Sequence, residues 1–222
     1  MVDFSQARRT MVDSQLRTFD VNDIPLLDAM DSVPRERFVL PGREELAYID
    51  QNVLVSDGAE RRFMLTPMVL ARMIQALRIE PGERVLDVAC GRGYSSAVLC
   101  ELGARVTALE SDEALAQAAR QALEGAGYGY GSVSVEVGPL DQGSPVDGGY
   151  NAILVNGAVD LRPEGLLRQL ADGGRLVCVT GRGRAGRATL YVRSGDAFSE
   201  RNLFDAAAPA LAAFEAKPGF VF

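Results

Sequence analysis

The sequence predicts an α/β fold: a mostly parallel, seven-stranded sheet with helices on both faces and a helical extension at the N-terminus. Three observations support this prediction. Short apolar runs alternate with amphipathic segments between residues 84 and 180, a glycine-bearing turn joins the first run to a helix, and two β-rich segments at 188–193 and 197–204 flank a Ser-Gly-Asp turn. Alternating strands and helices imply parallel strands with right-handed crossovers, whereas the last two strands form an antiparallel pair.

Residues 1–62 are expected to form the N-terminal extension. Residues 3–18 and 22–31 have helical periodicity, with Phe4, Ala7 and Met11 on one apolar face. Proline at position 34 breaks the helical pattern, and residues 34–62, rich in charged and turn residues, are expected to be irregular.

Residues 63–222 are expected to hold the sheet. Thr66 and Pro67 begin a helix, because threonine is favoured at the N-cap and proline at the first helical position. The elements that follow are strand 84–88, helix 94–101, strand 105–109, helix 112–123, strand 133–137, strand 152–155, helix 163–170 and strand 175–180.

Composition excludes several classes of protein. A net charge of −7 argues against nucleic acid as a partner, and residues 181–187, with their arginines, are expected to be a solvated loop. No apolar run approaches the ~20 residues that cross a bilayer, and no signal peptide is recognisable, so we expect a cytoplasmic protein without membrane contact. We expect a monomer rather than an oligomer. The chain has no histidine and three cysteines without Cys-x-x-Cys spacing, so we expect reduced thiols and no metal site.

The segment at residues 85–94 carries the strongest functional signal. Gly91 and Gly93 leave the backbone free of Cβ atoms, so a flat polar cofactor can lie against the turn and the start of the helix. Glu110 ends the next strand and is placed to accept hydrogen bonds from both ribose hydroxyls of an adenosine. Turn and carboxylate together predict a nucleoside cofactor.

The residues that other nucleotide-binding motifs require, and that this sequence lacks, narrow the choice of nucleoside cofactor. A dinucleotide fingerprint needs a third glycine where this chain has Ser96, and a phosphate-binding Gly-Lys-Ser/Thr sequence is absent. Asp87 would repel a pyrophosphate but suits a cationic cofactor. S-adenosyl-L-methionine is a sulfonium with no phosphate, and methyl transfer to a carboxylate needs no general base, which suits a chain without histidine. We therefore predict this cofactor.

The pattern Asp-x-Ala-Cys-Gly-x-Gly at residues 87–93 resembles the first motif of the Rossmann-like class I methyltransferases. Nearly the whole chain resembles the protein-L-isoaspartate O-methyltransferase family, most specifically at residues 11–17, 29–35 and 47–50. The resemblance implies a protein or peptide substrate whose isoaspartyl carboxylate is methylated as the first step of repair through a succinimide. It also implies that residues 1–62 form the substrate side and residues 63–222 the cofactor-binding domain.

The predicted cofactor site contains residues from the turn and from the ends of the next two strands. They are Asp87, Ala89, Cys90, Gly91, Gly93, Tyr94, Glu110, Ser111, Pro139 and Leu140. In the family, a Gly-Asp-Gly sequence supplies an aspartate to the adenine, but Pro139 occupies that position here. Because proline offers no carboxylate, we expect weaker cofactor binding than is usual for the family.

The substrate side departs from the family at its signature Thr-Ile-Ser-x-Pro. Aligned on Pro67, this chain has Phe63 and Leu65 in place of the threonine and the serine. Thr66 is a candidate catalytic residue, with helix capping as the alternative. Asn156 is the second candidate, because it ends the fourth strand and should face the cleft; an Asx turn is its alternative.

Three interpretations of function remain open at this point. The first is isoaspartyl repair, and the second is methyl transfer to a different acceptor. The third is a protein that binds the cofactor or a partner without catalysis.

Overall fold

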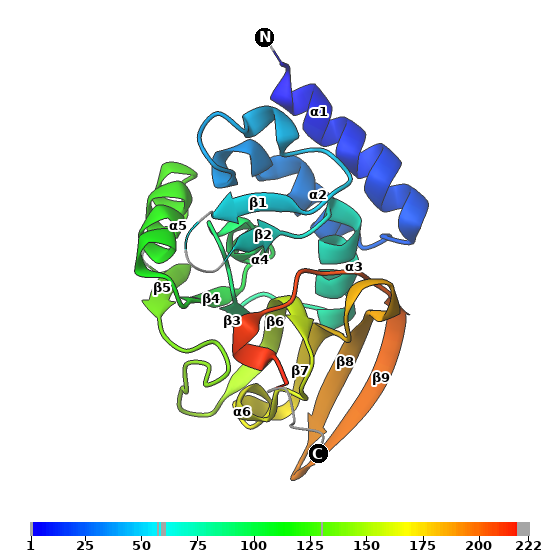
Figure 1. The fold of residues 1–222 in the computed structure, drawn as a ribbon, viewed down its shortest axis with the longest axis vertical. Helices are drawn as coiled ribbons and strands as arrows, with labels where there is room; N and C mark the ends of the chain where they lie inside the picture. The colour runs from blue at the N-terminus through cyan, green and yellow to red at the C-terminus, as the bar shows by residue number, and fades with distance from the viewer. Residues whose placement is uncertain (1, 57, 59–60, 130, 217–222) are drawn as a thin grey trace, which may run out of the picture.

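The computed structural model describes residues 2–56, 58, 61–129 and 131–216. Its centre is a seven-stranded sheet with the order β5-β4-β3-β6-β7-β8-β9 (Figure 1). The strands from β5 to β7 are parallel, and β8 and β9 continue the sheet as antiparallel neighbours. The predicted fold class is therefore confirmed.

Strands β3, β4, β5, β8 and β9 agree with the predicted bounds to within one residue at each end, whereas β6 and β7 are longer than predicted. Their bounds are β3 Arg84–Val88, β4 Arg105–Glu110, β5 Val133–Val137, β6 Tyr150–Val159, β7 Leu170–Thr180, β8 Arg187–Ser194 and β9 Ala197–Asp205. The helices are α1 Phe4–Met11, α2 Ile24–Ser32, α3 Pro67–Leu77, α4 Tyr94–Glu101, α5 Glu113–Gly125 and α6 Glu164–Leu167.

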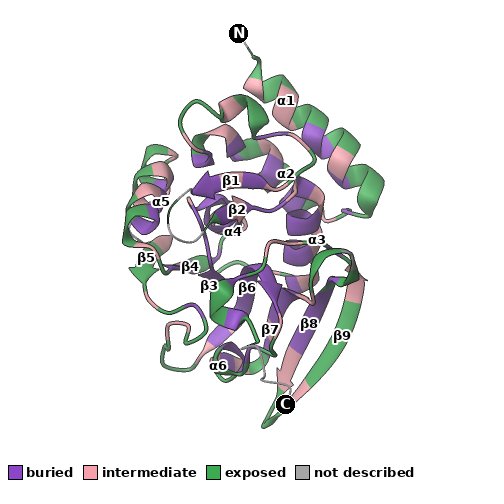
Figure 2. Ribbon diagram, in the orientation of Figure 1, coloured by how far each residue is buried: buried purple, intermediate pink, exposed green. Residues whose placement is uncertain are grey.

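Side chains alternate between two cores on the two faces of the sheet. Val85 of β3 belongs to the core shared with α3, α4 and the N-terminal helices, whereas its neighbour Leu86 belongs to the core shared with α6. Strands β3 and β6 are buried almost throughout, β7 is buried mainly over residues 176–179, and β9, at the edge, is largely exposed (Figure 2). No helix in the described part of the chain is both long enough and apolar enough to cross a membrane.

The connection between β6 and β7 differs from the prediction. The helix expected over 163–170 is the short α6, and β7 begins at Leu170. Leu170 lies opposite Tyr150 in the sheet, with an irregular register before Ala152. Strand pairing with Tyr150 therefore takes Leu170 out of the expected helix.

The first predicted helix is also interrupted. Helix α1 ends at Met11 and continues as a wider π turn, Val12–Leu16, and a 3-10 turn, Arg17–Phe19. Met11 and Leu16 are both fully buried, and an i to i+5 turn brings these two positions onto one face. Burial of both side chains therefore accounts for the wider turn.

The prediction that residues 34–62 are irregular is wrong at their end. Strand β1 (Val53–Ser56) pairs in antiparallel fashion with β2 (Arg62–Met64), and this hairpin lies between the N-terminal helices and the sheet (Figure 1). The charged stretch between the strands concealed the pairing in the sequence. Strand β2 runs across the proposed boundary between residues 62 and 63, and the division into two units stays a prediction.

The C-terminal segment returns to the sheet after β9. Ala158 of β6 donates its N–H to the carbonyl of Pro209 at 2.8 Å and accepts from the N–H of Leu211 at 3.0 Å. Leu211 and Phe214 are buried in the core that contains α6. This alanine-rich segment therefore covers one face of the sheet near the end of β6.

The loop at residues 181–187 carries paired charges. Arg182 forms an ion pair with Asp160, and Arg187 lies 3.5 Å from a carboxylate oxygen of Asp205. Both arginines are substantially exposed, so the loop matches the solvated segment expected from the sequence.

Candidate active site

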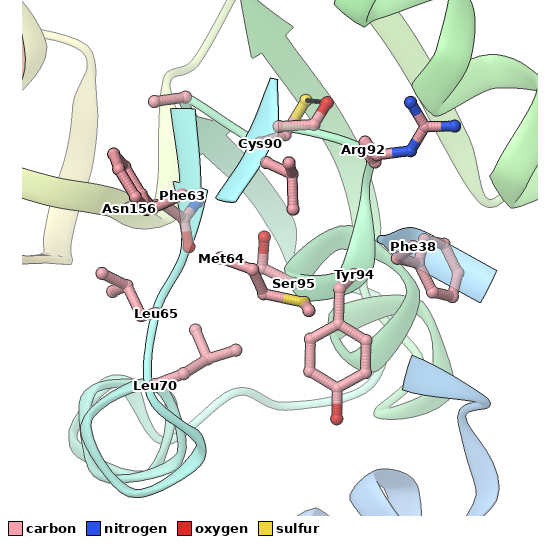
Figure 3. A pocket seen from close by; sticks show the side chains of 13 residues that line it. Phe38, Phe63, Met64, Leu65, Leu70, Cys90, Arg92, Tyr94, Ser95 and Asn156 are labelled. Carbon is pink, nitrogen blue, oxygen red and sulfur yellow. Dashed lines mark hydrogen bonds between the residues drawn. The ribbon is translucent and has the colours of Figure 1, made fainter. Parts of the chain in front are cut away.

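The carboxyl ends of β3 and β6 and the β1–β2 hairpin enclose a small cavity (Figure 3). Its volume is about 10 Å³. The lining residues come from the hairpin, the glycine turn, the start of α4 and the neighbouring elements: Phe38, Val55, Phe63, Met64, Leu65, Leu70, Ala89, Cys90, Gly91, Arg92, Tyr94, Ser95 and Asn156. Several predicted site residues therefore meet at one place.

The turn between β3 and α4 has an unusual backbone. Ala89, Gly91 and Gly93 have φ angles of 56°, 60° and 94°, in the left-handed region that glycine tolerates best. A Cβ at Gly93 would lie 2.9 Å from Leu123 of α5, whereas a Cβ at Gly91 would lie 3.2 Å from Val55 of β1. Gly93 thus allows helix packing, and Gly91 allows the hairpin to approach the turn.

Asp87 lies beneath this turn and is fully buried. Its carboxylate accepts hydrogen bonds from Ser95 Oγ at 2.7 Å, Ser96 Oγ at 2.5 Å and Asn156 Nδ2 at 2.6 Å. Burial raises the pKa of Asp87 to about 6, although the three donors favour the ionised form. Asp87 therefore joins β3, α4 and β6 through side chains of the protein itself.

Asn156 is held by two acceptors. Its Nδ2 donates to Asp87 Oδ1 and, at 3.1 Å, to the carbonyl oxygen of Val88. The alternative of an Asx turn at the strand end is wrong, because β6 continues to Val159. With Nδ2 occupied, Oδ1 is the amide atom left to face the cavity, and the catalytic role of Asn156 stays a prediction.

Glu110 ends β4 next to the turn and has no exposed surface. Its Oε2 accepts from the Gly91 N–H at 3.1 Å, and its Oε1 accepts from the Ser111 N–H at 2.8 Å and from Arg62 Nε at 3.1 Å. Arg62 Nη2 also donates to Ser111 Oγ at 2.8 Å. The predicted ribose carboxylate therefore binds both the glycine turn and strand β2.

Sequence reasoning did not identify Arg62. The signal for it is the two-residue period of β2, in which Arg62 and Met64 are buried and Phe63 is less so. An arginine on the inward side of a short strand requires a partner, and Glu110 is that partner.

Tyr94 points away from the glycine turn toward the N-terminal extension (Figure 3). Its ring lies 4.6 Å from the Arg35 guanidinium carbon and 5.8 Å from the Phe38 ring. Arg35 is fully buried, and it donates to the carbonyl oxygens of Ala47 and Leu65, each at 2.7 Å. Arg35, which sequence reasoning also missed as a site residue, thus ties the extension to the cavity wall.

The thiol of Cys90 lies in the cavity wall and is nearly buried. Burial raises the pKa of Cys90 well above its usual range, with the nearby carboxylates of Asp87 and Glu110 adding to the effect. Cys90 is therefore a neutral thiol at physiological pH.

Thr66, for which a catalytic role and helix capping were the two alternatives, lies at the start of α3. Thr66 occupies the N-cap position of α3, as predicted, but its side chain makes no capping hydrogen bond. Its backbone N–H donates to Asn52 Oδ1 at 3.0 Å. Phe63 and Leu65 line the cavity, whereas Thr66 does not, and a catalytic role for Thr66 stays a prediction.

The predicted adenine side lies beside Glu110. The Gly138 N–H donates to the Glu110 carbonyl at 3.0 Å, which places Pro139 next to the end of β4. Pro139 is exposed, whereas Leu140 is buried in the core with Leu109. Contacts of Pro139, Leu140 and Ser111 with a cofactor stay predictions.

Comparison with known proteins agrees with this geometry. Residues 7–206 match the family model of protein-L-isoaspartate(D-aspartate) O-methyltransferase. A protein-L-isoaspartate O-methyltransferase of Methylorubrum populi is 43% identical over 79% of this chain and 80% of its own length. One from Roseiflexus sp. is 37% identical over 92% of this chain and 91% of its own length.

Solved structures show the same fold. A protein-L-isoaspartate O-methyltransferase superposes with a TM-score of 0.80 at 24% identity, covering 93% of this chain and 67% of the other. A Plasmodium falciparum protein assigned to the same activity, in complex with S-adenosyl-L-homocysteine, superposes with a TM-score of 0.74 at 20% identity, covering 93% and 98%. Family model, relatives and fold agree: the chain belongs to the protein-L-isoaspartate O-methyltransferase family.

Proposed function

We propose that this chain is an S-adenosyl-L-methionine-dependent methyltransferase that methylates isoaspartyl carboxylates in damaged proteins. The observation that carries the proposal is the contact between the glycine turn and Glu110, within a chain that matches the family over residues 7–206. A carboxylate beside a positive-φ glycine turn is suited to the ribose of an adenosine. The relatives, which are named protein-L-isoaspartate O-methyltransferases, support an isoaspartyl carboxylate as the methyl acceptor.

The chemistry of the site fits the cofactor, but the space does not in this arrangement. Glu110 and the backbone at Gly91 are the groups expected to hold the nucleoside. A ligand of this size needs a pocket of roughly 300–1,000 Å³. The cavity between the β1–β2 hairpin and the glycine turn, which Glu110 does not line, measures only about 10 Å³.

The residues around the cavity define what the protein itself contributes. S-adenosyl-L-methionine, when bound, supplies a methyl group on a sulfonium. Arg35 holds the carbonyl of Leu65 and so positions the wall on the substrate side. The apolar side chains of Phe63, Leu65 and Leu70 form part of the cavity wall. An isoaspartyl carboxylate is already ionised near neutral pH, so no histidine is needed.

A second candidate function is methyl transfer to a different acceptor. Phe63 and Leu65 line the cavity where the family has hydroxyl side chains, and Asn156 Oδ1 is left to face it. These differences favour slow turnover on isoaspartyl peptides or a preference for another group. The expected monomer and cytoplasmic location are part of the same proposal.

Transfer of labelled methyl from S-adenosyl-L-methionine to an isoaspartyl peptide tests the proposal, with the normal aspartyl peptide as the control. Base-labile label on the isoaspartyl peptide alone is the expected result. Glu110→Ala should abolish this labelling. Cofactor binding without transfer would point to a different acceptor or to a protein that binds the cofactor without catalysis, and a complete lack of cofactor binding would contradict both candidate functions.

A further inference from the structure

The ion pair between Arg62 and Glu110 connects the β1–β2 hairpin to the predicted cofactor carboxylate. Arg62 is 4% exposed in its side chain and Glu110 is 0% exposed, and Arg62 Nε lies 3.1 Å from Glu110 Oε1. The two residues are far apart in the chain, so the hairpin must be in place for the pair to form. The ion pair therefore forms only when the hairpin occupies this position.

Arg62 occupies acceptor capacity that a ribose would need. A carboxylate offers about four lone-pair positions. Among the described residues, Ser111 N–H, Arg62 Nε and, at 3.4 Å, Ser111 Oγ donate to Oε1, and Gly91 N–H donates to Oε2. One position on Oε2 remains, whereas two ribose hydroxyls require two.

Strand β1 adds a steric obstacle. Val55 lies against the turn, where it would come within 3.2 Å of a Cβ on Gly91. Val55 and three residues at or next to β2, Phe63, Met64 and Leu65, also line the cavity of about 10 Å³. That volume is close to the minimum for a single water molecule. The hairpin and Arg62 together therefore close the predicted cofactor site at the glycine turn.

We propose that Arg62 is a latch: it competes with the cofactor ribose for Glu110, and the β1–β2 hairpin must release Glu110 before the cofactor binds. The inference rests on the proposed function, because it takes the nucleoside cofactor as the competing ligand. It assigns a role to a residue of β2 that lies outside the glycine motif.

Binding of S-adenosyl-L-homocysteine to Arg62→Gln tests the latch. Glutamine retains a donor but loses the charge, and a neutral hydrogen bond is weaker than a charge-assisted one. The variant should therefore bind about tenfold more tightly and associate faster than the unmodified chain. Titration calorimetry and stopped-flow fluorescence provide the two measurements.

Arg61→Gln is the matched control. It removes the same charge from the same hairpin, but Arg61 is exposed and lies over the Phe63 ring at 5.4 Å. It should bind like the unmodified chain. Equal or weaker binding by Arg62→Gln than by Arg61→Gln would overturn the latch.

A second measurement does not depend on the cofactor. Cys90 lies in the cavity wall near the hairpin, and Cys178 lies in β7, fully buried. Labelling with a thiol reagent, mapped by mass spectrometry, should modify Cys90 about tenfold faster in Arg62→Gln while Cys178 is unchanged, since the weaker hydrogen bond releases the hairpin more often. A parallel rise at Cys178 would indicate general destabilisation and overturn the latch, as would unchanged labelling of Cys90.

The two measurements separate the latch from the proposed function. Faster labelling of Cys90 without S-adenosyl-L-homocysteine binding by either protein would show that Arg62 holds the hairpin in place, but it would overturn the competition with a ribose and remove the cofactor assignment. Binding by both proteins with equal affinity would uphold the cofactor assignment and remove the latch.

Discussion

Replacement of Asn156 by alanine should destabilise the protein in a manner that depends on pH. The substitution removes the Nδ2 donor that lies 2.6 Å from Asp87 Oδ1. Asp87 is fully buried, and burial raises its pKa to about 6. The lost hydrogen bond is therefore charge-assisted at high pH and neutral at low pH.

The expected magnitude follows from the two protonation states. Above the pKa of Asp87, loss of a donor to a buried carboxylate should cost about 1.5–3 kcal/mol of unfolding free energy. Below that pKa the acceptor is a neutral carboxyl, and the cost should fall to about 0.5–1.5 kcal/mol. The sign is set by the raised pKa: the native carboxyl is protonated at pH values where an unfolded aspartate is already ionised.

Urea-induced unfolding at about pH 5 and about pH 8 measures both values, since these conditions lie on either side of the Asp87 pKa. Asn151→Ala is the matched control, because Asn151 also lies on β6 but accepts from the backbone N–H of Arg84 at 2.9 Å. Its cost should be the same at both pH values. An equal cost of Asn156→Ala at both pH values would refute the role assigned to Asp87.

Three further predictions concern the same site. In the unmodified chain, the unfolding free energy should decrease by up to about 3 kcal/mol as the pH rises from about 4 to about 6, the window between the unfolded and native pKa of Asp87. Asp87→Asn should remove this decrease, as measured by denaturant titration, and an unaltered pH profile would contradict this. Pro139→Asp should tighten S-adenosyl-L-homocysteine binding by about tenfold in calorimetry, because it restores an adenine acceptor; weaker binding by a folded variant would show that the loop is misplaced. The double substitution Phe63→Thr and Leu65→Ser should raise turnover on an isoaspartyl peptide by about tenfold or more, since it supplies hydroxyls that can orient the acceptor, and unchanged turnover in a methyl-transfer assay would count against that role.

The sequence by itself determined the sheet, the glycine turn and the carboxylate at Glu110. These features depend on short-range patterns: apolar runs of strand length, glycines at a turn, and an acid at the end of the next strand. Residues 84–88, 94–101 and 133–137 were predicted with the bounds that the structure has. Local signals were sufficient for these elements: an apolar run at residues 84–88, the glycine turn before residue 94, and alternating valines at residues 133–137.

Only the tertiary structure decided which polar groups meet at the site. Arg62 and Glu110 are separated by 48 positions, and Asn156 and Asp87 by 69. The hairpin that carries Arg62 was read as irregular, because strands of four and three residues give little periodicity. Strand alternation shows that a side chain faces inward, but the partner it finds there depends on the relative placement of elements distant in the chain. For a buried carboxylate, that placement decides whether its oxygens are available to a ligand or already accept hydrogen bonds from the protein.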